Sequence, residues 1–381
     1  MPSPPVQSDE LEIVEDNQYY PVEDEEEDGN EAPNEEELDV VDKSLFSFEL
    51  HSKSVFCCEL SSDTRLAASG GEDDRSFVWK TEDGSLLFEC TGHGDSVVVV
   101  RFNCSCKLLA TGDMKGLIKI WDLQTASCVA DFDMEELTWL EWHPALENVF
   151  LYGTADGNCY LNKIDGSNQS EIKIMSGNTA ALAGQILSDG KRSAVGYENG
   201  DVRLWDLKNC ASAFCSKEND LNNQVTALAV RPDDSVVAAG YLNSKLKLIN
   251  LSTGRTLFEK KREDAEENSV EALVFCSSLP ILAVGYLNGE LDLWDLNTLT
   301  KRDSTKLQGG ITKLALSPNR HHLLYVSSID GTIRSFDIRD LRPLAEYTGH
   351  RESVLDFSIS KQNNFILSCS DDSTCKLFRI D

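Results

Sequence analysis

Apolar and polar residues alternate over short stretches of this chain, for example in Leu117–Trp121 (LIKIW) and Val202–Trp205 (VRLW). Alternation with a period of two is typical of β-strands that bury one face. Asp-Gly and Asn-Gly pairs separate such stretches, and they suit tight hairpins because type I′ turns need positive φ angles. These pairs are Asp156-Gly157, Asn199-Gly200, Asn288-Gly289 and Asp330-Gly331. No long helical period is present, so the pattern predicts an all-β protein.

One unit recurs along the chain: a Gly/Ser-rich stretch, a turn with Asp or Asn, alternating residues, and a closing position that is usually aromatic. The closing positions are Trp79, Trp121, Asn162, Trp205, Ile249, Trp294, Phe336 and Phe378, at intervals of 42, 41, 43, 44, 45, 42 and 42 residues. A period of about 40–45 residues with Trp-Asp endings is typical of the WD-repeat β-propeller. Eight closing positions predict eight blades.

The last unit lacks an outer strand, because only three residues follow Phe378. Residues 44–51 (SLFSFELH) are similar to the outer strand and loop of the first unit at 85–93 (SLLFECTGH). We therefore expect Leu45–Leu50 to supply the missing strand and to remove the open sheet edge. The predicted domains are a disordered acidic tail over residues 1–43 and an eight-bladed propeller over residues 44–381.

A His, a Ser or Thr, an Asp and a Trp form an internal hydrogen-bond network in repeats of this kind. The first unit has His51, Ser69, Asp73 and Trp79; the second has His93, Thr111 and Trp121 with Lys115 at the Asp position; the last has His350, Ser368 and Asp372 with Phe378 in place of Trp. These sets look like catalytic triads or metal ligands. We interpret them as structural groups that satisfy one another's polar atoms inside the blades.

The chain is strongly acidic, with 65 Asp and Glu against 35 Lys and Arg and a net charge of −30. Residues 1–42 hold 17 acidic and no basic side chains, and the remaining 339 residues hold 48 acidic and 35 basic ones. Such a surface repels nucleic-acid phosphate. We expect a basic protein segment as the partner, without direct nucleic-acid binding, and a monomeric chain. The tail is either a solvating leader or an arm that captures the basic partner.

Twelve cysteines are scattered along the chain without a C-x-x-C pair. The N-terminus (MPSPPVQSDELE) lacks the features of a signal peptide, and no run of 18 apolar residues is present to span a membrane. We expect free thiols in a reducing compartment, which is the cytoplasm with the nucleus as a second location. Phosphate-binding, dinucleotide-binding, zinc-protease and nucleophile-elbow motifs are missing. We therefore expect no catalysis, no cofactor and no metal.

Propellers commonly bind partners on one face around the central channel. Residues just before each turn Asp or Asn, and residues that lead into each innermost strand, point to that face. The acidic candidates for partner binding are Glu72, Asp95, Glu136, Glu198, Glu352 and Asp371. Trp139 is a further candidate, either as an exposed aromatic anchor or as a packing residue between blades.

Several longer segments resemble the angio-associated migratory cell protein family. They include GGEDDRSFVW, LLFECTGHGDSV, ATGDMKGLIKIW, LTWLEWHP, AVGYENGDVRLWDLK and GHRESVLDF, and the most specific is Asn268–Gly289 (NSVEALVFCSSLPILAVGYLNG). The similarity runs in order from about residue 45 to the end. The acidic leader is similar in composition only.

This resemblance implies a non-catalytic eight-bladed propeller. Animal members of the family are associated with cell migration, and the fungal relative resembles a chaperone that captures a basic large-subunit ribosomal protein. The leading hypothesis is therefore an escort for a ribosomal protein in ribosome assembly, and the alternative is a scaffold in cell migration and angiogenesis-related signalling. A third hypothesis is a cullin-RING ubiquitin ligase substrate receptor, because Phe336–Arg339 (FDIR) is similar to a W-D-x-R motif.

Overall fold

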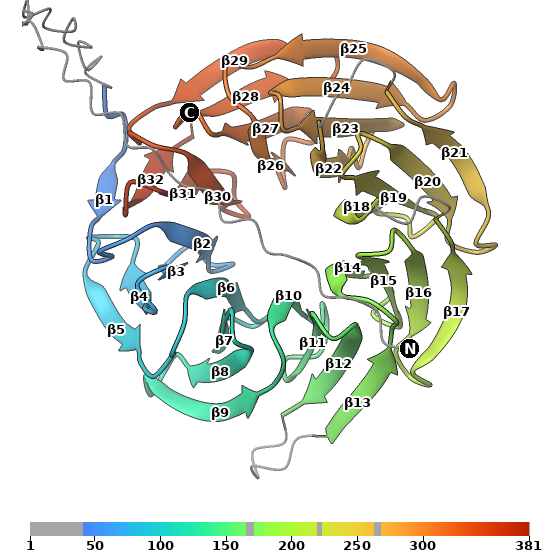
Figure 1. The fold of residues 1–381 in the computed structure, drawn as a ribbon. Helices are drawn as coiled ribbons and strands as arrows, with labels where there is room; N and C mark the ends of the chain where they lie inside the picture. Colours follow the sequence, from blue (N-terminus) through green and yellow to red (C-terminus); the bar gives the residue numbers. More distant parts are fainter. Residues whose placement is uncertain (1–40, 165–170, 219–222, 263–267, 381) are drawn as a thin grey trace, which may run out of the picture. The chain divides into compact units, whose positions relative to one another are not determined.

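Eight four-stranded antiparallel sheets are arranged in a ring around a central axis, as Figure 1 shows. The computed structural model describes residues 41–164, 171–218, 223–262 and 268–380. All of them belong to the unit that runs from Val40 to Asp381. The described residues contain strands and turns but no helix. The predicted eight-bladed all-β propeller is confirmed, whereas residues 1–40 of the predicted tail lie outside the described residues.

The first four blades follow one another along the chain. Blade 1 consists of β2 (Val55–Leu60), β3 (Leu66–Gly71), β4 (Ser76–Lys80) and β5 (Leu86–Cys90). Blade 2 consists of β6 (Val97–Phe102), β7 (Leu108–Asp113), β8 (Leu117–Asp122) and β9 (Ser127–Asp133). Blade 3 consists of β10 (Leu137–Trp142), β11 (Val149–Thr154), β12 (Asn158–Lys163) and β13 (Glu171–Ser176). Blade 4 consists of β14 (Ala181–Ile186), β15 (Arg192–Tyr197), β16 (Val202–Asp206) and β17 (Ala211–Ser216).

The second half of the ring repeats this arrangement. Blade 5 consists of β18 (Val225–Val230), β19 (Val236–Tyr241), β20 (Leu246–Asn250) and β21 (Thr256–Lys260). Blade 6 consists of β22 (Val270–Phe275), β23 (Ile281–Tyr286), β24 (Glu290–Asp295) and β25 (Thr300–Lys306). Blade 7 consists of β26 (Ile311–Leu316), β27 (Leu323–Ser328), β28 (Ile333–Asp337) and β29 (Arg342–Tyr347). Blade 8 consists of β30 (Val354–Ile359), β31 (Phe365–Ser370), β32 (Cys375–Arg379) and, as its outer strand, β1 (Phe46–Phe48).

The N-terminal strand β1 closes the ring, as predicted. It pairs antiparallel with β32, with Phe46 opposite Leu377 and Phe48 opposite Cys375. The backbone N–H of Leu45 adds a hydrogen bond of 2.8 Å to the carbonyl oxygen of Leu377. The strand itself is shorter than the predicted Leu45–Leu50. Because it comes from the other end of the chain, it joins the first and last blades without leaving the edge of β32 open.

The hydrophobic core lies between neighbouring blades. Cys57 and Cys58 show the arrangement: Cys57 packs in the cluster with residues of blade 2, and Cys58 packs in the cluster with residues of blade 8. Successive side chains of a strand point to opposite faces, so each inner strand contributes to two interfaces. Second strands such as β11 are buried throughout, whereas the outer strand β25 is almost entirely exposed. No blade can bury its faces alone, which explains why the ring must close.

Every innermost strand carries a β-bulge at its second residue. The pairing register shifts between Val55 and Cys57 in blade 1 and at the matching place in each of the other blades. A bulge bends its strand and redirects a side chain. Because every blade also has the same antiparallel strand order, the matching loops and turns of all eight blades lie at one end of the propeller.

Candidate functional site

One end of the propeller, which we name the turn face, is formed by two sets of residues. The turn positions directly follow the second strand of each blade: Glu72, Met114, Ala155, Glu198, Leu242, Leu287, Ile329 and Asp371. The leading positions directly precede each innermost strand: Ser54, Ser96, Glu136, Ala180, Gln224, Ser269, Gly310 and Ser353. In every blade the backbone N–H of the turn position donates to the carbonyl oxygen of the leading position over 2.9–3.1 Å. This repeated bond fixes the turn position beside the loop in all eight blades.

All six acidic residues predicted as partner contacts lie on the turn face. Glu72, Glu198 and Asp371 are turn positions, Glu136 is a leading position, and Asp95 and Glu352 come one residue before a leading position. The side chains of Glu136, Glu198 and Glu352 are exposed. Two further exposed acidic residues, Asp74 two positions after Glu72 and Glu135 directly before Glu136, are not predicted by the sequence analysis. The fold therefore brings together carboxylates that are up to 299 residues apart in the sequence.

Two of the six carboxylates are partly neutralised by lysines. Lys53 Nζ lies 3.4 Å from Glu72 Oε1, and Lys115 Nζ lies 3.2 Å from Asp95 Oδ2. The backbone N–H of Ser96 and the Lys115 ammonium hold the pKa of Asp95 below its ordinary value. Within the ranges that the structure describes, the other four carboxylates take part in no ion pair. The turn face therefore presents four carboxylates that no basic side chain of the described residues pairs with.

Trp139 is a packing residue between blades 3 and 4. Its indole Nε1–H donates to the carbonyl oxygen of Ala181 over 3.0 Å. A Cβ atom on Gly184 would lie 2.1 Å from the indole ring, and one on Gly153 would lie 2.2 Å from Nε1. Two glycines thus make room for the ring, which is half-buried against the cluster of those blades. These contacts favour the interpretation of Trp139 as a packing residue between blades, because its N–H and part of its ring are already used.

The predicted network of blade 1 is present for three of its four members. His51 Nδ1 lies 2.9 Å from Asp73 Oδ1, and His51 Nε2 lies 2.9 Å from Ser69 Oγ. Burial by itself raises the pKa of Asp73, but hydrogen bonds from His51 and from the backbone N–H of Ser52 outweigh it and hold that pKa below its ordinary value. The indole N–H of Trp79 has no hydrogen-bond partner in the described residues. Trp79 instead contributes its ring to the core.

Blade 2 differs from the prediction at the carboxylate. Lys115 was expected at the Asp position, yet His93 Nδ1 lies 3.1 Å from Asp113 Oδ2 and His93 Nε2 lies 2.7 Å from Thr111 Oγ1. Trp121 Nε1–H completes the network by donating to Thr111 Oγ1 over 2.9 Å. Asp113 occupies the register position of Gly71 in blade 1. In blade 1, a Cβ atom on Gly71 would lie 3.0 Å from His51 Nδ1. A side chain at this register position therefore points to the histidine, which explains how Asp113 reaches His93 in blade 2.

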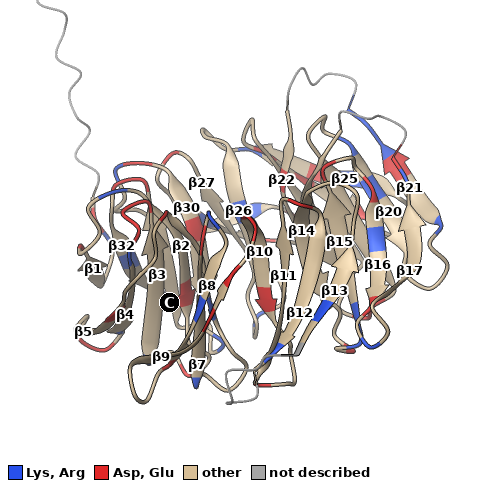
Figure 2. Cartoon of the chain, turned by 60° about the horizontal axis from the view of Figure 1, so that its bottom comes forward, with Lys and Arg blue, Asp and Glu red and all other residues tan. Residues whose placement is uncertain are grey.

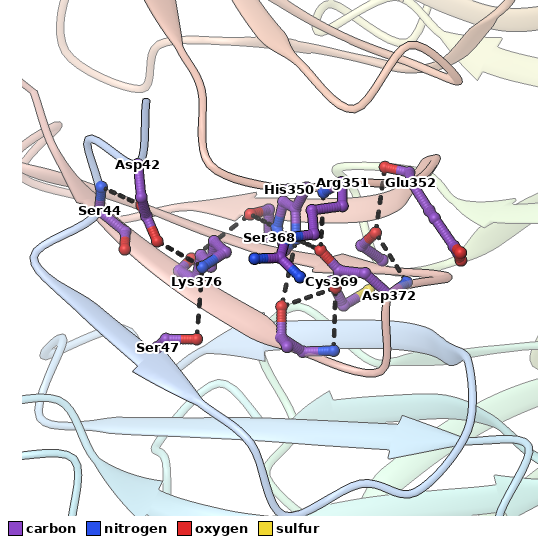
Figure 3. Close-up of polar contacts among 12 residues, drawn as sticks. Asp42, Ser44, Ser47, His350, Arg351, Glu352, Ser368, Cys369, Asp372 and Lys376 are labelled. Atoms are coloured by element: carbon purple, nitrogen blue, oxygen red, sulfur yellow. Dashed lines mark hydrogen bonds and ion pairs between the residues drawn. The ribbon is translucent and has the colours of Figure 1, made fainter. Parts of the chain in front are cut away.

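Blade 8 combines its network with the closing segment, as Figure 3 shows. His350 Nδ1 lies 2.9 Å from Asp372 Oδ2, and His350 Nε2 lies 2.7 Å from Ser368 Oγ. On the next strand, Lys376 Nζ donates to Asp42 Oδ2 over 2.6 Å. Phe378 fills the Trp position and is buried. In all three blades the histidine, the carboxylate and the hydroxyl are thus bonded to one another inside the blade.

Charged side chains also join the innermost strands to one another. The backbone N–H of Phe102 donates to Glu59 Oε2, and that of Ile186 donates to Glu141 Oε2, each over 2.5 Å. Lys313 on β26 and Asp356 on β30 form an ion pair of 2.6 Å, and both strands carry charged segments in Figure 2. Burial raises the pKa of Glu141 to about 7. These contacts hold neighbouring blades together across the inner ring.

The Phe336–Arg339 segment lies at the opposite end of blade 7, where β28 ends. Arg339 Nε donates to Asp337 Oδ1 over 2.8 Å, and its Nη2 atom lies 2.5 Å from Asp337 Oδ2. This pair, chiefly through the hydrogen bond from Arg339, lowers the pKa of Asp337 to about 2. The guanidinium plane is therefore bound within the motif itself.

The described residues contain no group of three or more His, Cys, Asp and Glu side chains that could hold a metal ion. All twelve cysteines are free, and burial raises the pKa of thiols such as Cys57 and Cys369 well above the ordinary value. Among the described residues, no helix is long and apolar enough to cross a membrane. The feature that the described residues do assemble is the charged surface of the turn face.

Sequence reasoning missed a second feature of the turn face. The turn positions of blades 5, 6 and 7 are apolar: Leu242, Leu287 and Ile329 are 44%, 48% and 47% exposed. The signal was available in the repeats, because GYLN, GYLN and SSID carry an apolar residue where GYEN carries Glu198. The side-by-side packing of blades 5, 6 and 7 places these three residues at matching positions on one face.

Comparison with known proteins agrees with the fold. A family model described as "WD domain, G-beta repeat" matches residues 42–80, 84–122, 301–337 and 341–379. Each match covers the outer strand of one blade and the first three strands of the next. The angio-associated migratory cell protein of Homo sapiens is 39% identical over 352 residues, which cover 88% of this chain and 80% of the human protein.

More distant similarity points to a fungal ribosome assembly protein. The Saccharomyces cerevisiae "Ribosome assembly protein SQT1" is 24% identical over 94% of this chain and 93% of its own length. The crystal structure of Saccharomyces cerevisiae Sqt1 has a TM-score of 0.82 at 22% identity, covering 89% of this chain and 99% of that one. Sqt1 of Chaetomium thermophilum, solved bound to the N-terminus of the ribosomal protein L10, has a TM-score of 0.81 at 22% identity, covering 89% and 100%.

Proposed function

The chain belongs to the family of the angio-associated migratory cell protein, and from that premise we propose that it is a non-enzymatic propeller that escorts a basic segment of a large-subunit ribosomal protein during ribosome assembly. The observation that carries this proposal is the gathering of six acidic side chains on the turn face, four of them without an ion pair among the described residues. The proposal is also supported by the crystal structure of the fungal relative Sqt1 bound to the N-terminus of the ribosomal protein L10.

The physical argument is electrostatic. A newly made ribosomal protein carries cationic segments that bind RNA, and an acidic face attracts such a segment by complementary potential. Charge complementarity mainly raises the association rate and the specificity, and it weakens with ionic strength. Binding of this kind is readily reversed when RNA competes for the same cations. The partner in this proposal is therefore a protein segment, held by a monomeric chain in the cytoplasm.

The test measures binding of a labelled L10 N-terminal peptide to the full chain by fluorescence anisotropy at low and at physiological salt. Reversing three exposed carboxylates (Glu136→Lys, Glu198→Lys and Glu352→Lys) is expected to weaken binding at least about tenfold at low salt. The matched control reverses the exposed Glu82, Asp131 and Asp303, which lie away from the turn face, and it is expected to bind as the wild type does. Equal losses in both variants, or no binding by the wild type, would contradict the proposal.

A further inference from the structure

Three neighbouring blades present large apolar side chains at the same place on the turn face. Leu242, Leu287 and Ile329 are the turn positions of blades 5, 6 and 7, and each is nearly half exposed. We name these three residues the apolar arc. Single exposed leucines are ordinary on protein surfaces, but adjacent ones on one face mark an interaction site.

The loop of blade 7 leaves part of this arc uncovered. The two residues before β26 are Gly309 and Gly310, so they place no side chain over the turn. A Cβ atom on Gly310 would lie 2.3 Å from the carbonyl oxygen of Leu287 and 3.6 Å from Ile329 Cδ1. The backbone of Leu287 and the side chain of Ile329 therefore both lie close to Gly310, which has no side chain of its own to cover them.

Carboxylates stand at both ends of the apolar arc. The preceding turn position, in blade 4, is Glu198, and the following one, in blade 8, is Asp371. Neither takes part in an ion pair within the described part of the chain. The order around the ring is thus acidic, apolar, apolar, apolar, acidic.

Two basic side chains that follow the turns of blades 5 and 6, Lys245 and Arg262, are paired with carboxylates. Lys245, two residues after the turn residue Asn243, has its Nζ atom 2.9 Å from Glu218 Oε1 and also contacts Glu259. Arg262, the last described residue before residue 268, contacts Glu290. Burial lowers the pKa of Lys245, but the hydrogen bonds from its ammonium to Glu218 and Glu259 outweigh this and raise it. Their positive charge is balanced locally, so it does not oppose a cationic partner.

We propose that the apolar arc binds aliphatic or aromatic side chains of the same basic segment that the acidic residues attract. The occupant is an extended peptide with an apolar centre and Lys or Arg on both sides, its cations at Glu198 and Asp371. This inference rests on the proposed function and deepens it, because it assigns the partner a defined order of side chains. Charge brings the segment to the turn face, and burial of its apolar residues retains it.

The test compares two labelled synthetic peptides of equal charge by fluorescence anisotropy with the full chain. One is Lys-Arg-Leu-Tyr-Leu-Arg-Lys, and the other is Lys-Arg-Gly-Ser-Gly-Arg-Lys. The first peptide is expected to bind at least about thirtyfold more tightly, since each buried aliphatic side chain contributes roughly tenfold. That preference is expected to persist at high salt, because apolar burial is not screened.

Protein variants then locate the preference. Changing Leu242, Leu287 and Ile329 together to Ser is expected to abolish the preference and leave the affinity for the Gly-Ser peptide unchanged. The matched control changes Leu86, Leu257 and Leu344 to Ser; these are 44%, 48% and 44% exposed on outer strands. Melting curves of both variants show whether each remains folded.

Each outcome decides a different point. Equal affinity of the wild type for both peptides would overturn the apolar arc and leave charge-driven capture standing. Binding of neither peptide would overturn both proposals. If the wild type sediments as a dimer and the serine variant as a monomer, the arc binds a second copy of this chain. That result would overturn the peptide as its occupant.

Discussion

Phe48 stacks on Trp79 with ring centroids 4.8 Å apart and an angle of 6° between the ring planes. Phe48 belongs to the closing strand β1 of blade 8, and Trp79 belongs to β4 of blade 1. Both side chains are buried, at 3% and 0% exposure. The ring is therefore closed twice, by the backbone pairing of β1 with β32 and by this stacking across the blade junction.

The first prediction concerns this junction. Phe48→Ala is expected to lower the free energy of unfolding by about 3–5 kcal/mol, because it removes a buried aromatic ring and leaves a cavity beside Trp79. Urea denaturation followed by tryptophan fluorescence measures this change. The control is Leu45→Ala in the same segment, where the side chain is 57% exposed. Equal effects of the two substitutions would contradict the role of the stack.

A second prediction separates Asp113 from Lys115 in blade 2. Asp113 is 1% exposed, bonds His93, and accepts from the backbone N–H of Leu117 over 3.0 Å. Asp113→Ala is expected to destabilise the chain by about 2–3 kcal/mol, because it leaves buried donors without an acceptor. Lys115→Ala is expected to change stability by less than about 0.5 kcal/mol, because that side chain is 71% exposed. Thermal melts of the two variants check this order, and its reversal would refute it.

The third prediction follows from the low pKa of Asp372. Burial alone raises the pKa of Asp372, but the hydrogen bond from His350 and its charge outweigh burial and hold that pKa far below the ordinary value of 3.8. A carboxyl with a depressed pKa stabilises the fold above its ordinary pKa, and the stabilisation is lost as pH falls towards the depressed value. Asp372→Asn is therefore expected to cost about 2 kcal/mol from pH 5 to 7 and progressively less below pH 4. Denaturation midpoints across this range measure it; a cost that grows towards acid pH would contradict the assignment.

Glu141 gives a prediction of opposite sign. Burial raises its pKa to about 7 from the ordinary 4.5, so the folded chain binds a proton that the unfolded chain releases between these values. Stability is therefore expected to fall as pH rises from about 4.5 to 7. Glu141→Gln keeps an acceptor for the backbone N–H of Ile186 and removes the charge. We expect it to stabilise the chain by about 2 kcal/mol at pH 8 and to have little effect at pH 5.

The neighbouring blade supplies the control for Glu141. Gln185 already uses its amide oxygen to accept from the backbone N–H of Val230 over 2.7 Å, the same contact one blade further on. Gln185→Glu is expected to place a second buried carboxyl in the inner ring, where burial disfavours its ionised form. The melting temperature should therefore fall more at pH 8 than at pH 5. Differential scanning calorimetry at both pH values measures both variants. A Glu141→Gln variant that is no more stable at pH 8 would show that the carboxyl is not penalised there.

The repeat spacing was sufficient for the fold but not for the details of each blade. Closing positions from Trp79 to Phe378 predicted eight blades, and the similarity of residues 44–51 to the end of blade 1 predicted the closing strand. The predicted position of the blade 2 carboxylate is wrong, because the repeat pattern puts it at Lys115 whereas His93 bonds Asp113, two residues earlier. The sequence does not decide between the two interpretations of Trp139, because the cover of its ring depends on Gly153 in the paired strand and on Gly184 in the next blade.

The sequence by itself determined the architecture, because strand alternation, turn chemistry and the repeat period are local and recur eight times. It also determined the excess of negative charge and where each carboxylate stands within its own repeat. Only the tertiary structure decided which of these residues meet. Side-by-side packing of the blades brings Glu198, the apolar arc and Asp371 onto one face, and closure by β1 brings Phe48 onto Trp79. Such neighbours come from different repeats, so their contact depends on the curvature of the whole ring and not on any local pattern.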